Sequence, residues 1–474
     1  MDTTEYDLIV LGAGPVGENV ADRAVRGGLT TVLVEHELVG GECSYWACMP
    51  SKALLRSAQV LRAARQVPGA AQAVTGALDV QAVLNRRDSF TNNWSDEGQV
   101  QWVEGAGISL VRGHGRISGP KRVTVTGPDG TTTVLTARHA VAVATGSDAF
   151  IPGIAGLDEA DPWTSREATS AKTVPESLVV IGGGVVAAEM ATAYASFGTT
   201  VTVIVRGRLL PGAEPFAGEL VAKALREQGV TVLLDTETTR VVRDGAHVTV
   251  ETSGGATITA EEVLVATGRT PRTTDLGLDS IGLTPGEWLR TDDTMLVPGF
   301  DWLYAVGDVN RRALLTHQGK YQARAVGDVI AARAAGAAVS DAPWGTHVAT
   351  ADHRAVPQVT FTDPEVASVG LTAQAARDAG FQVRVVDYEI GNVAGASVHA
   401  DGYTGTARMV VDEERKVLLG VTFVGPEVSE LLHAATIAVV GEVPIDRLWH
   451  AVPSYPTVSE VWLRLLEAYG RPTA

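Results

Sequence analysis

The 474-residue sequence contains only two cysteines, Cys43 and Cys48, which excludes the disulfide framework of a small secreted protein. It also lacks an apolar run near the roughly 18 residues that a membrane-spanning helix needs, so we expect no membrane association. The first residues are acidic and lead directly into a strand-like segment, and we expect no cleavable signal peptide. These absences together predict a cytoplasmic protein.

Positive charge is scarce relative to negative charge. Lysine and arginine number 38 against 55 aspartates and glutamates, which gives a formal net charge of −17. Such an acidic surface argues against a general affinity for nucleic acid or anionic membranes, although it leaves room for a local basic pocket. Hydrophobic residues make up 45% of the chain, which excludes a mostly disordered protein.

Glycine, by contrast, is abundant, with 51 residues, and it is concentrated in two similar segments. Each segment has an apolar run, a glycine turn, a helix-like stretch and a second apolar run. An apolar strand ending in Ala-Thr-Gly follows each of them, at 141–146 and at 263–268. We therefore predict an α/β protein with two doubly wound, Rossmann-like dinucleotide-binding domains and a C-terminal α+β domain.

The first glycine turn predicts a dinucleotide site. Glycine at Gly12, Gly14 and Gly17 lets the backbone approach a pyrophosphate, and the helix that follows offers its N–H groups to that anion. Glu35 ends the second apolar run, about 20 residues on, where an acid binds a ribose hydroxyl. The alternative is that these glycines serve tight packing alone.

The second turn contains Gly182, Gly184 and Ala187, and its second strand leads into Val205 instead of an acid. Arg206 and Arg208 stand beside that valine. A missing carboxylate and a nearby arginine favour a 2′-phosphate, so we expect NADPH, with NADH possible. The alternative is that both arginines belong to a solvated loop.

The two cysteines lie close together in the segment 40–52. They could be buried and inert, but a dithiol just after a dinucleotide motif favours redox chemistry. They cannot form a tetrahedral zinc site without further ligands, and we expect no metal. A helix beginning near Pro50 would place its N-terminus beside Cys48 and favour the thiolate.

The segment 40–52 resembles the redox-active disulfide region of the class I pyridine nucleotide–disulfide oxidoreductases. That family includes glutathione reductase, dihydrolipoyl dehydrogenase, mercuric reductase and the soluble transhydrogenases. Segments 303–309 and 356–370 resemble its second flavin motif and the start of its dimerisation domain. The resemblance implies an FAD-binding domain at 1–150 completed by 271–345, an NAD(P)-binding domain at 151–270, and a dimerisation domain at 346–474.

The resemblance also implies residue roles, with FAD and NADPH as cofactors and a homodimer whose active site is shared between subunits. Cys48 would be the charge-transfer thiol and Cys43 the interchange thiol. Lys52 would lie near flavin N5, paired with Glu189, and such a cation stabilises reduced flavin; the alternative is two surface charges. The implied cofactor-binding residues are Gly12, Gly14, Gly17, Glu35, Thr145, Gly146 and Asp308 for FAD, and Gly182, Gly184, Ala187, Arg206, Arg208 and Gly268 for the nicotinamide cofactor.

The C-terminal motif departs from the family. Tyr455 stands where the partner's acid–base histidine is usual, Glu460 remains, and His450 lies too far upstream to be assumed a substitute. Tyrosine, with a pKa of about 10, is a poor proton shuttle, which argues against glutathione reductase or dihydrolipoyl dehydrogenase activity. The end of the chain, 469–474, contains no cysteine pair, which argues against mercuric reductase.

We therefore predict an FAD-dependent NAD(P)H oxidoreductase. Hydride would pass to the flavin and an electron pair then to Cys43–Cys48, or directly to a small-molecule acceptor such as a quinone. One alternative is a soluble transhydrogenase: the sequence around Trp46 resembles that group, although its members typically lack the second cysteine, which is Cys48 here. The other alternative is a dihydrolipoyl dehydrogenase with a substitute proton donor. A flavin-binding redox sensor and a structural protein with vestigial sites are alternatives outside the enzymes.

Overall fold

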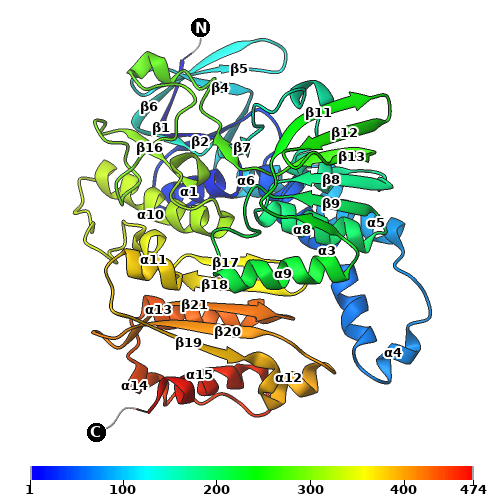
Figure 1. Ribbon diagram of the computed structural model, residues 1–474. Helices are drawn as coiled ribbons and strands as arrows, with labels where there is room; N and C mark the ends of the chain where they lie inside the picture. Colours follow the sequence, from blue (N-terminus) through cyan, green and yellow to red (C-terminus); the bar gives the residue numbers. More distant parts are fainter. Residues whose placement is uncertain (1–2, 472–474) are drawn as a thin grey trace. The chain divides into compact units, whose positions relative to one another are not determined.

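The computed structural model describes residues 3–471, so Pro472–Ala474 at the end of the cysteine-free tail lie outside the described residues. The chain divides into two compact units. Unit 1 contains 88–150, 269–353 and the residues up to Pro50, and unit 2 contains 51–87, 151–268 and the residues from Arg354 onward. Residues 48–50 of helix α3 (Cys48–Arg65), which is labelled in Figure 1, belong to unit 1, and the rest of the helix belongs to unit 2.

Unit 1 is built on a seven-stranded sheet in the order β3-β2-β1-β6-β5-β4, with β16 also paired to β6. Strands β1, β2, β3, β6 and β16 pair in parallel, whereas β4, β5 and β6 form an antiparallel meander. The strands are β1 (Thr3–Leu11), β2 (Thr31–Glu35), β3 (Ser109–Arg112), β4 (His114–Gly119), β5 (Arg122–Thr126), β6 (Thr132–Val143) and β16 (Leu303–Ala305), with a separate pair β7 (Ser147–Ala149) and β15 (Arg269–Pro271).

Successive side chains along β1 point to opposite faces of the sheet. Leu8 and Val10 pack with helices α1 (Pro15–Arg26) and α10 (Thr316–Ala334), whereas Ile9 and Leu11 pack against residues of β5 on the other face. Both faces are therefore buried, which explains the continuous apolar run of this strand. The other helices that begin in unit 1 are α2 (Gly41–Tyr45) and α6 (Glu97–Gly105).

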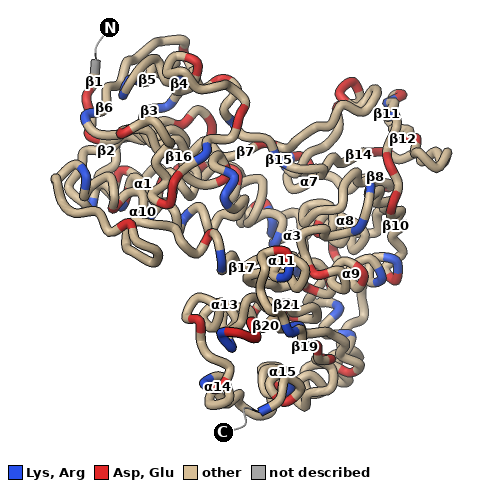
Figure 2. The backbone as a smooth tube through the Cα atoms, turned by 60° about the vertical axis from the view of Figure 1, so that its left-hand side comes forward, with Lys and Arg blue, Asp and Glu red and all other residues tan. Residues whose placement is uncertain are grey.

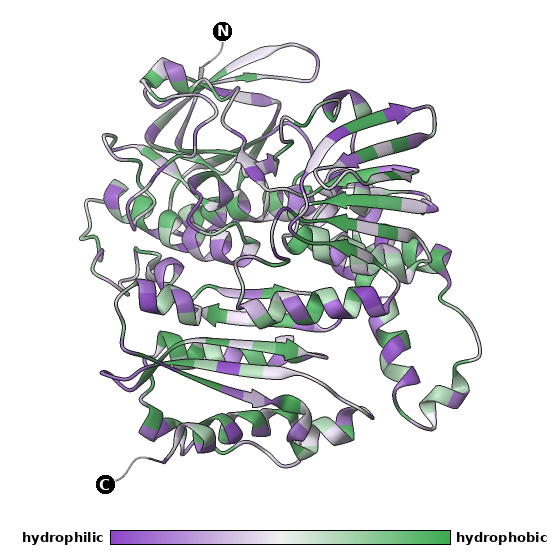
Figure 3. Ribbon diagram, viewed as in Figure 1, coloured by the Kyte–Doolittle hydropathy of each residue, from purple (hydrophilic) through white to green (hydrophobic). Residues whose placement is uncertain are grey.

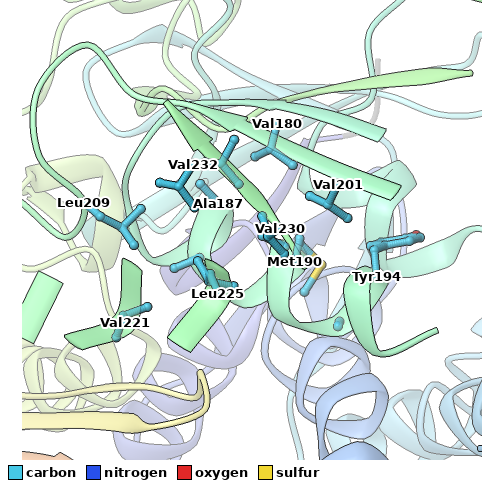
Figure 4. Packing of buried hydrophobic residues seen from close by; sticks show 14 of the residues in the cluster. Val180, Ala187, Met190, Tyr194, Val201, Leu209, Val221, Leu225, Val230 and Val232 are labelled. Carbon is cyan, nitrogen blue, oxygen red and sulfur yellow. The ribbon is translucent and has the colours of Figure 1, made fainter. Parts of the chain in front are cut away.

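In unit 2, a four-stranded parallel sheet has the order β10-β9-β8-β14. Figure 4 shows side chains of this sheet and of its helices pointing toward one another, among them Val180, Val201, Met190 and Leu225. A three-stranded antiparallel sheet, β11-β12-β13, packs with the other face. The elements are β8 (Ser177–Ile181), α8 (Val185–Ser196), β9 (Thr200–Ile204), α9 (Pro215–Glu227), β10 (Thr231–Leu233), β11 (Thr238–Asp244), β12 (His247–Thr252), β13 (Thr257–Ala260), β14 (Glu262–Val265), α4 (Ala70–Ala73), α5 (Val80–Phe90) and α7 (Ser165–Ser170).

The C-terminal part of unit 2 is an antiparallel sheet in the order β17-β18-β21-β20-β19. Every residue of β21 is buried, and in Figure 3 this strand is largely in the hydrophobic colour. Helices α13 and α15 pack on one face and α11 on the other. The elements are β17 (Pro357–Thr360), β18 (Glu365–Gly370), α11 (Ala373–Asp378), β19 (Val383–Glu389), α12 (Ala394–His399), β20 (Thr406–Asp412), β21 (Val417–Gly425), α13 (Leu432–Val440), α14 (Ile445–Leu448) and α15 (Val461–Tyr469).

The predicted fold class is confirmed. The two strand–turn–helix–strand segments form β1-α1-β2 and β8-α8-β9, and each Ala-Thr-Gly strand, β6 or β14, pairs in parallel beside the first strand of its own sheet. Within residues 3–471, no helix is long and apolar enough to cross a membrane. Figure 2 shows acidic and basic residues interspersed along both units.

Candidate functional site

The first glycine turn connects β1 to α1 with little room for side chains. Gly12 has φ +98°, and a Cβ added there would lie 2.5 Å from the carbonyl oxygen of Ala144. A Cβ on Gly17 would lie 1.9 Å from the carbonyl oxygen of Gly12. These contacts require glycine at both positions and leave the N-terminus of α1 at the carboxyl edge of the parallel strands, where doubly wound sheets bind ligands.

Two carboxylates, the buried Glu35 and the half-buried Asp308, stand at the same edge of the unit 1 sheet. Glu35, the last residue of β2, accepts the Ala13 N–H on Oε2 at 2.7 Å and the Glu37 N–H on Oε1 at 2.8 Å. Asp308 follows β16 and accepts the Ser147 hydroxyl at 2.6 Å. Burial raises the pKa of Asp308 above its ordinary value. A glycine turn, a helix N-terminus and two acids fit the phosphate and hydroxyl groups of a dinucleotide such as FAD.

Thr145 and Gly146 follow β6 at this edge. The Thr145 hydroxyl donates to the carbonyl oxygen of Arg272 at 2.9 Å, and Gly146 has φ +74° with open space around it. Arg269 donates to the Ser147 hydroxyl oxygen at 3.0 Å, and so supports the hydroxyl that Asp308 binds. Sequence reasoning missed Ser147 and Arg269, because only the fold brings them to Asp308.

The second glycine turn repeats the geometry with one difference. Gly182 has φ +131°, and a Cβ there would lie 2.2 Å from the carbonyl oxygen of Ala266, while Gly268 has φ +148°. Ala187 is fully buried, so the third position accommodates a Cβ here. A Cβ on Gly183 would approach Cγ1 of Val205 to 2.4 Å, so an apolar side chain occupies the place of the acid.

The two arginines after Val205 are both exposed but have different surroundings. Arg208 donates to the carbonyl oxygens of Pro211 at 2.6 Å and Ala213 at 3.1 Å, so its guanidinium organises the loop. Arg206 immediately follows Val205. The structure therefore distinguishes a loop-organising Arg208 from Arg206, the arginine next to the position of the missing acid.

Cys48 is the first residue of α3, and its Sγ lies 3.3 Å from Oγ1 of Thr316, the first residue of α10. Two helix N-termini therefore converge near this sulfur, and their dipoles favour a thiolate. Cys43 lies in α2. Its pKa is raised, first by a hydrogen bond to Cys48, then by burial and by the Cys48 charge, whereas Thr316 and Lys320 act in the opposite direction.

Lys52 follows Cys48 by one turn of α3, so the two side chains share a helix face. Its Nζ lies 2.8 Å from Oε2 of Glu189, which is the ion pair that the resemblance implies. Glu189 is buried, and its Oε1 accepts the Phe361 N–H at 2.9 Å. Nζ also lies 5.0 Å from the centroid of the Phe361 ring. The ammonium group is thus held by a carboxylate and an aromatic face.

The C-terminal motif places its two functional candidates in different surroundings. Tyr455 is 78% exposed, whereas Glu460 is buried and its Oε2 accepts the Gly395 N–H at 3.0 Å. Glu460 therefore satisfies a backbone donor at the start of α12. Among the described residues, no group of three histidine, cysteine, aspartate or glutamate side chains could hold a metal ion.

Residues 6–335 match the sequence family of pyridine nucleotide-disulphide oxidoreductases, and residues 356–465 match the dimerisation domain of that family. The chain belongs to this family. As a pyridine nucleotide-disulphide oxidoreductase it is an enzyme of a family whose members bind FAD and use NAD(P)H, and its dimerisation domain supports a homodimer.

Its relatives carry several names. A dihydrolipoyl dehydrogenase of Chlorobaculum tepidum is 34% identical over 96% of this chain and 95% of its own. A mercuric reductase of Staphylococcus aureus is 32% identical over 96% of this chain and 81% of its own. The HOCl-induced flavoprotein disulfide reductase RclA of Escherichia coli shares the fold, with a TM-score of 0.84 at 22% identity over 98% of this chain and 99% of that one.

Proposed function

We propose that this pyridine nucleotide-disulphide oxidoreductase oxidises NADPH and passes the electron pair through a Cys43–Cys48 dithiol to a small-molecule acceptor. The position of Cys48 carries the proposal, because its sulfur lies at the N-termini of α3 and α10 and within 3.3 Å of the Thr316 hydroxyl. Bound FAD would supply the hydride acceptor and the two-electron carrier between the nicotinamide and the cysteines. Direct reduction of a quinone, without the dithiol, is the competing route.

Residues of the two glycine turns would hold the cofactors. For FAD, the turn of Gly12, Gly14 and Gly17 would leave room for the pyrophosphate. Glu35 would bind the ribose hydroxyls and Asp308 the ribityl chain, with Thr145 and Gly146 beside them. For NADPH, Gly182, Gly184, Ala187 and Gly268 form the corresponding turn. Val205 in place of an acid removes repulsion, and the adjacent Arg206 is the better candidate for the 2′-phosphate because Arg208 is engaged by the loop.

The two sulfurs take different protonation states in this proposal. An electron pair that breaks the Cys43–Cys48 bond leaves two sulfur anions, and a proton from the transferred hydride is held by one sulfur. The helix N-termini favour the anion at Cys48, while its negative charge, the hydrogen bond and burial raise the pKa of Cys43. Cys43 therefore holds the proton and faces the acceptor as the interchange thiol.

Lys52 supplies a fixed positive charge on the same face of α3 as Cys48. Glu189 is buried and holds the ammonium at 2.8 Å, so the cation cannot easily reorient. We propose that this charge stabilises the negative charge that develops on reduction. The Phe361 N–H bond to the other carboxylate oxygen keeps Glu189 in place.

The homodimer would complete the site through Tyr455. This side chain is 78% exposed in the single chain, which leaves it accessible to a second subunit. A phenol exchanges protons poorly near neutral pH, so Tyr455 would contact the acceptor without serving as its acid–base group. Glu460 would support that loop through its bond to Gly395.

The test compares acceptors and cysteine variants in the FAD-loaded enzyme. NADPH oxidation is followed with a low-molecular-weight disulfide, a quinone and an NAD⁺ analogue, in the wild type and in Cys43→Ser. We expect the wild type to reduce the disulfide and Cys43→Ser to lose about a hundredfold or more of that rate while keeping NADPH binding. Equal rates in the two proteins with every acceptor would contradict a dithiol route and favour quinone reduction or transhydrogenation.

A further inference from the structure

Helices α1 and α10 cross closely beside the cysteine pair. A Cβ added to Gly319 in α10 would lie 2.6 Å from Cγ2 of Val16 in α1, so the two backbones nearly touch at this point. Lys320 directly follows Gly319, and Glu18 stands two residues after Val16. The buried Glu18 and the half-buried Lys320 therefore stand on the two helices that cross here.

The same crossing adjoins both cysteines. Thr316, one helical turn before Lys320, contacts Cys48. A Cβ on Gly41 at the start of α2 would lie 2.7 Å from Cα of Gly14, so the helix that carries Cys43 rests on the turn that begins α1. The charge of Lys320 acts on both the Cys43 thiol and the Glu18 carboxyl.

Glu18 is the unusual member of this group. It is 8% exposed, and its Oε1 is buried and has no hydrogen-bond partner. Burial raises its pKa to about 7, with Lys320 lowering it and Glu35 raising it further, and the Glu18 charge also acts on the Tyr45 hydroxyl. A carboxyl left unsatisfied in this way costs stability and is typical of a functional position.

We propose that Glu18 and Lys320 together set the ionisation of the Cys43 sulfur in the reduced enzyme, a role that rests on the proposed redox function of the cysteine pair. The positive charge of Lys320 favours the Cys43 thiolate. While Glu18 is protonated it carries no charge and does not weaken this effect. Once Glu18 is ionised, its negative charge disfavours the thiolate. The chain would thus supply from its own helices the proton control that Tyr455 does not provide.

The test measures alkylation of Cys43 by iodoacetamide as a function of pH in the FAD-loaded enzyme reduced anaerobically with NADPH, with the modified peptide quantified by mass spectrometry. Lys320→Met should slow alkylation at pH 7 by about fivefold, because a nearby cation favours the thiolate. Lys320→Arg should restore the rate. Lys223→Met, which removes an exposed lysine of α9, is the matched control and should behave as the wild type.

Glu18→Gln gives a second readout that a loss of packing would not produce. Its alkylation rate should equal that of the wild type at pH 6 and exceed it by about threefold at pH 8.5, where Glu18 would otherwise be ionised. A constant ratio across this range, or a Lys320→Met profile equal to that of Lys223→Met, would overturn the proposal. If Lys320→Met does not bind FAD, the pH profiles of Cys43 alkylation in Lys320→Arg and Glu18→Gln still test the proposal.

Failure of the underlying redox function has a different signature. If NADPH does not increase the alkylation of Cys43 in the wild type at any pH, the cysteine pair is not reduced and the proposed function fails. If NADPH exposes Cys43 to alkylation but the Glu18 and Lys320 variants leave the pH profile unchanged, only the electrostatic role is wrong.

Discussion

Glu35 and Val205 occupy equivalent positions in the two nucleotide-binding sheets. The Gly12 N–H donates to the carbonyl oxygen of Val34 at 2.9 Å, and the Gly182 N–H donates to that of Ile204 at 3.0 Å, so the next residues correspond. In the first sheet the Glu35 carboxylate binds the turn, and in the second Val205 packs against it. One backbone frame therefore carries an acid at this position in the first sheet and an apolar side chain in the second.

This difference predicts the nicotinamide preference. Arg206→Ala should raise the KM for NADPH about tenfold and leave the KM for NADH nearly unchanged, because only NADPH offers a 2′-phosphate to the guanidinium. Steady-state kinetics with both cofactors measure the effect. Arg240→Ala removes an exposed arginine that pairs with Glu251 in the same unit and serves as the control. A similar change in KM for both cofactors would show that Arg206 does not bind the 2′-phosphate.

The close approach at Gly17 predicts a steric effect on FAD binding. Gly17→Ala places a methyl group against the carbonyl oxygen of Gly12, so the turn must open and FAD retention during purification should fall severalfold. The ratio of flavin absorbance to protein absorbance reports this. Gly98→Ala lies in α6 with open space around its Cβ and should retain FAD fully. Full flavin content in Gly17→Ala would contradict the assignment of this turn.

Glu18 makes stability depend on pH. Its pKa is raised from 4.5 to about 7 in the folded protein, so the folded state binds the proton more tightly than the unfolded state. Stability is therefore lost as pH rises through this window, by about 3 kcal/mol at most. Glu18→Gln should be more stable than the wild type at pH 8 and show little difference at pH 4.5. Melting curves at both pH values test this, and an equal difference at both would contradict the burial effect.

The Lys52–Glu189 pair predicts non-additive energetics. Lys52→Met leaves a buried carboxylate without its cation and should cost about 2 to 3 kcal/mol of stability. Lys52→Met combined with Glu189→Gln removes the charge and should recover a substantial part of that loss. Denaturant unfolding of the two single variants and the double variant measures the coupling. Simple additivity would mean that the pair is not coupled in the folded protein.

Much of the architecture could be predicted from local pattern. Apolar runs followed by glycine turns identified β1-α1-β2 and β8-α8-β9, because strand, turn and helix signals there are contiguous. Strand β18 was not expected. It follows Pro364 directly and begins with the buried Glu365, and it pairs with β17 on one side and with the distant β21 on the other, so its strand character depends on partners that the local pattern does not show.

The candidate site shows the same division. Cys43, Cys48 and Lys52 could be identified because they lie within one short segment, and Glu189 was linked to Lys52 only through the family resemblance. Lys320 and Glu18 could not be identified, because they are far apart in sequence and only the crossing of α1 and α10 brings them to the same part of the unit. Periodicity reports which face of a helix is buried, not which residues of a second helix it meets.

An anaerobic titration of the FAD-loaded enzyme with NADPH decides whether Cys43 and Cys48 form a working redox pair. If they do, one equivalent of NADPH should produce a long-wavelength absorbance band from the Cys48 thiolate beside the flavin, and Cys48→Ser should lack this band. Bleaching of the flavin in the wild type without such a band would contradict the redox pair, since the electrons would then bypass the cysteines.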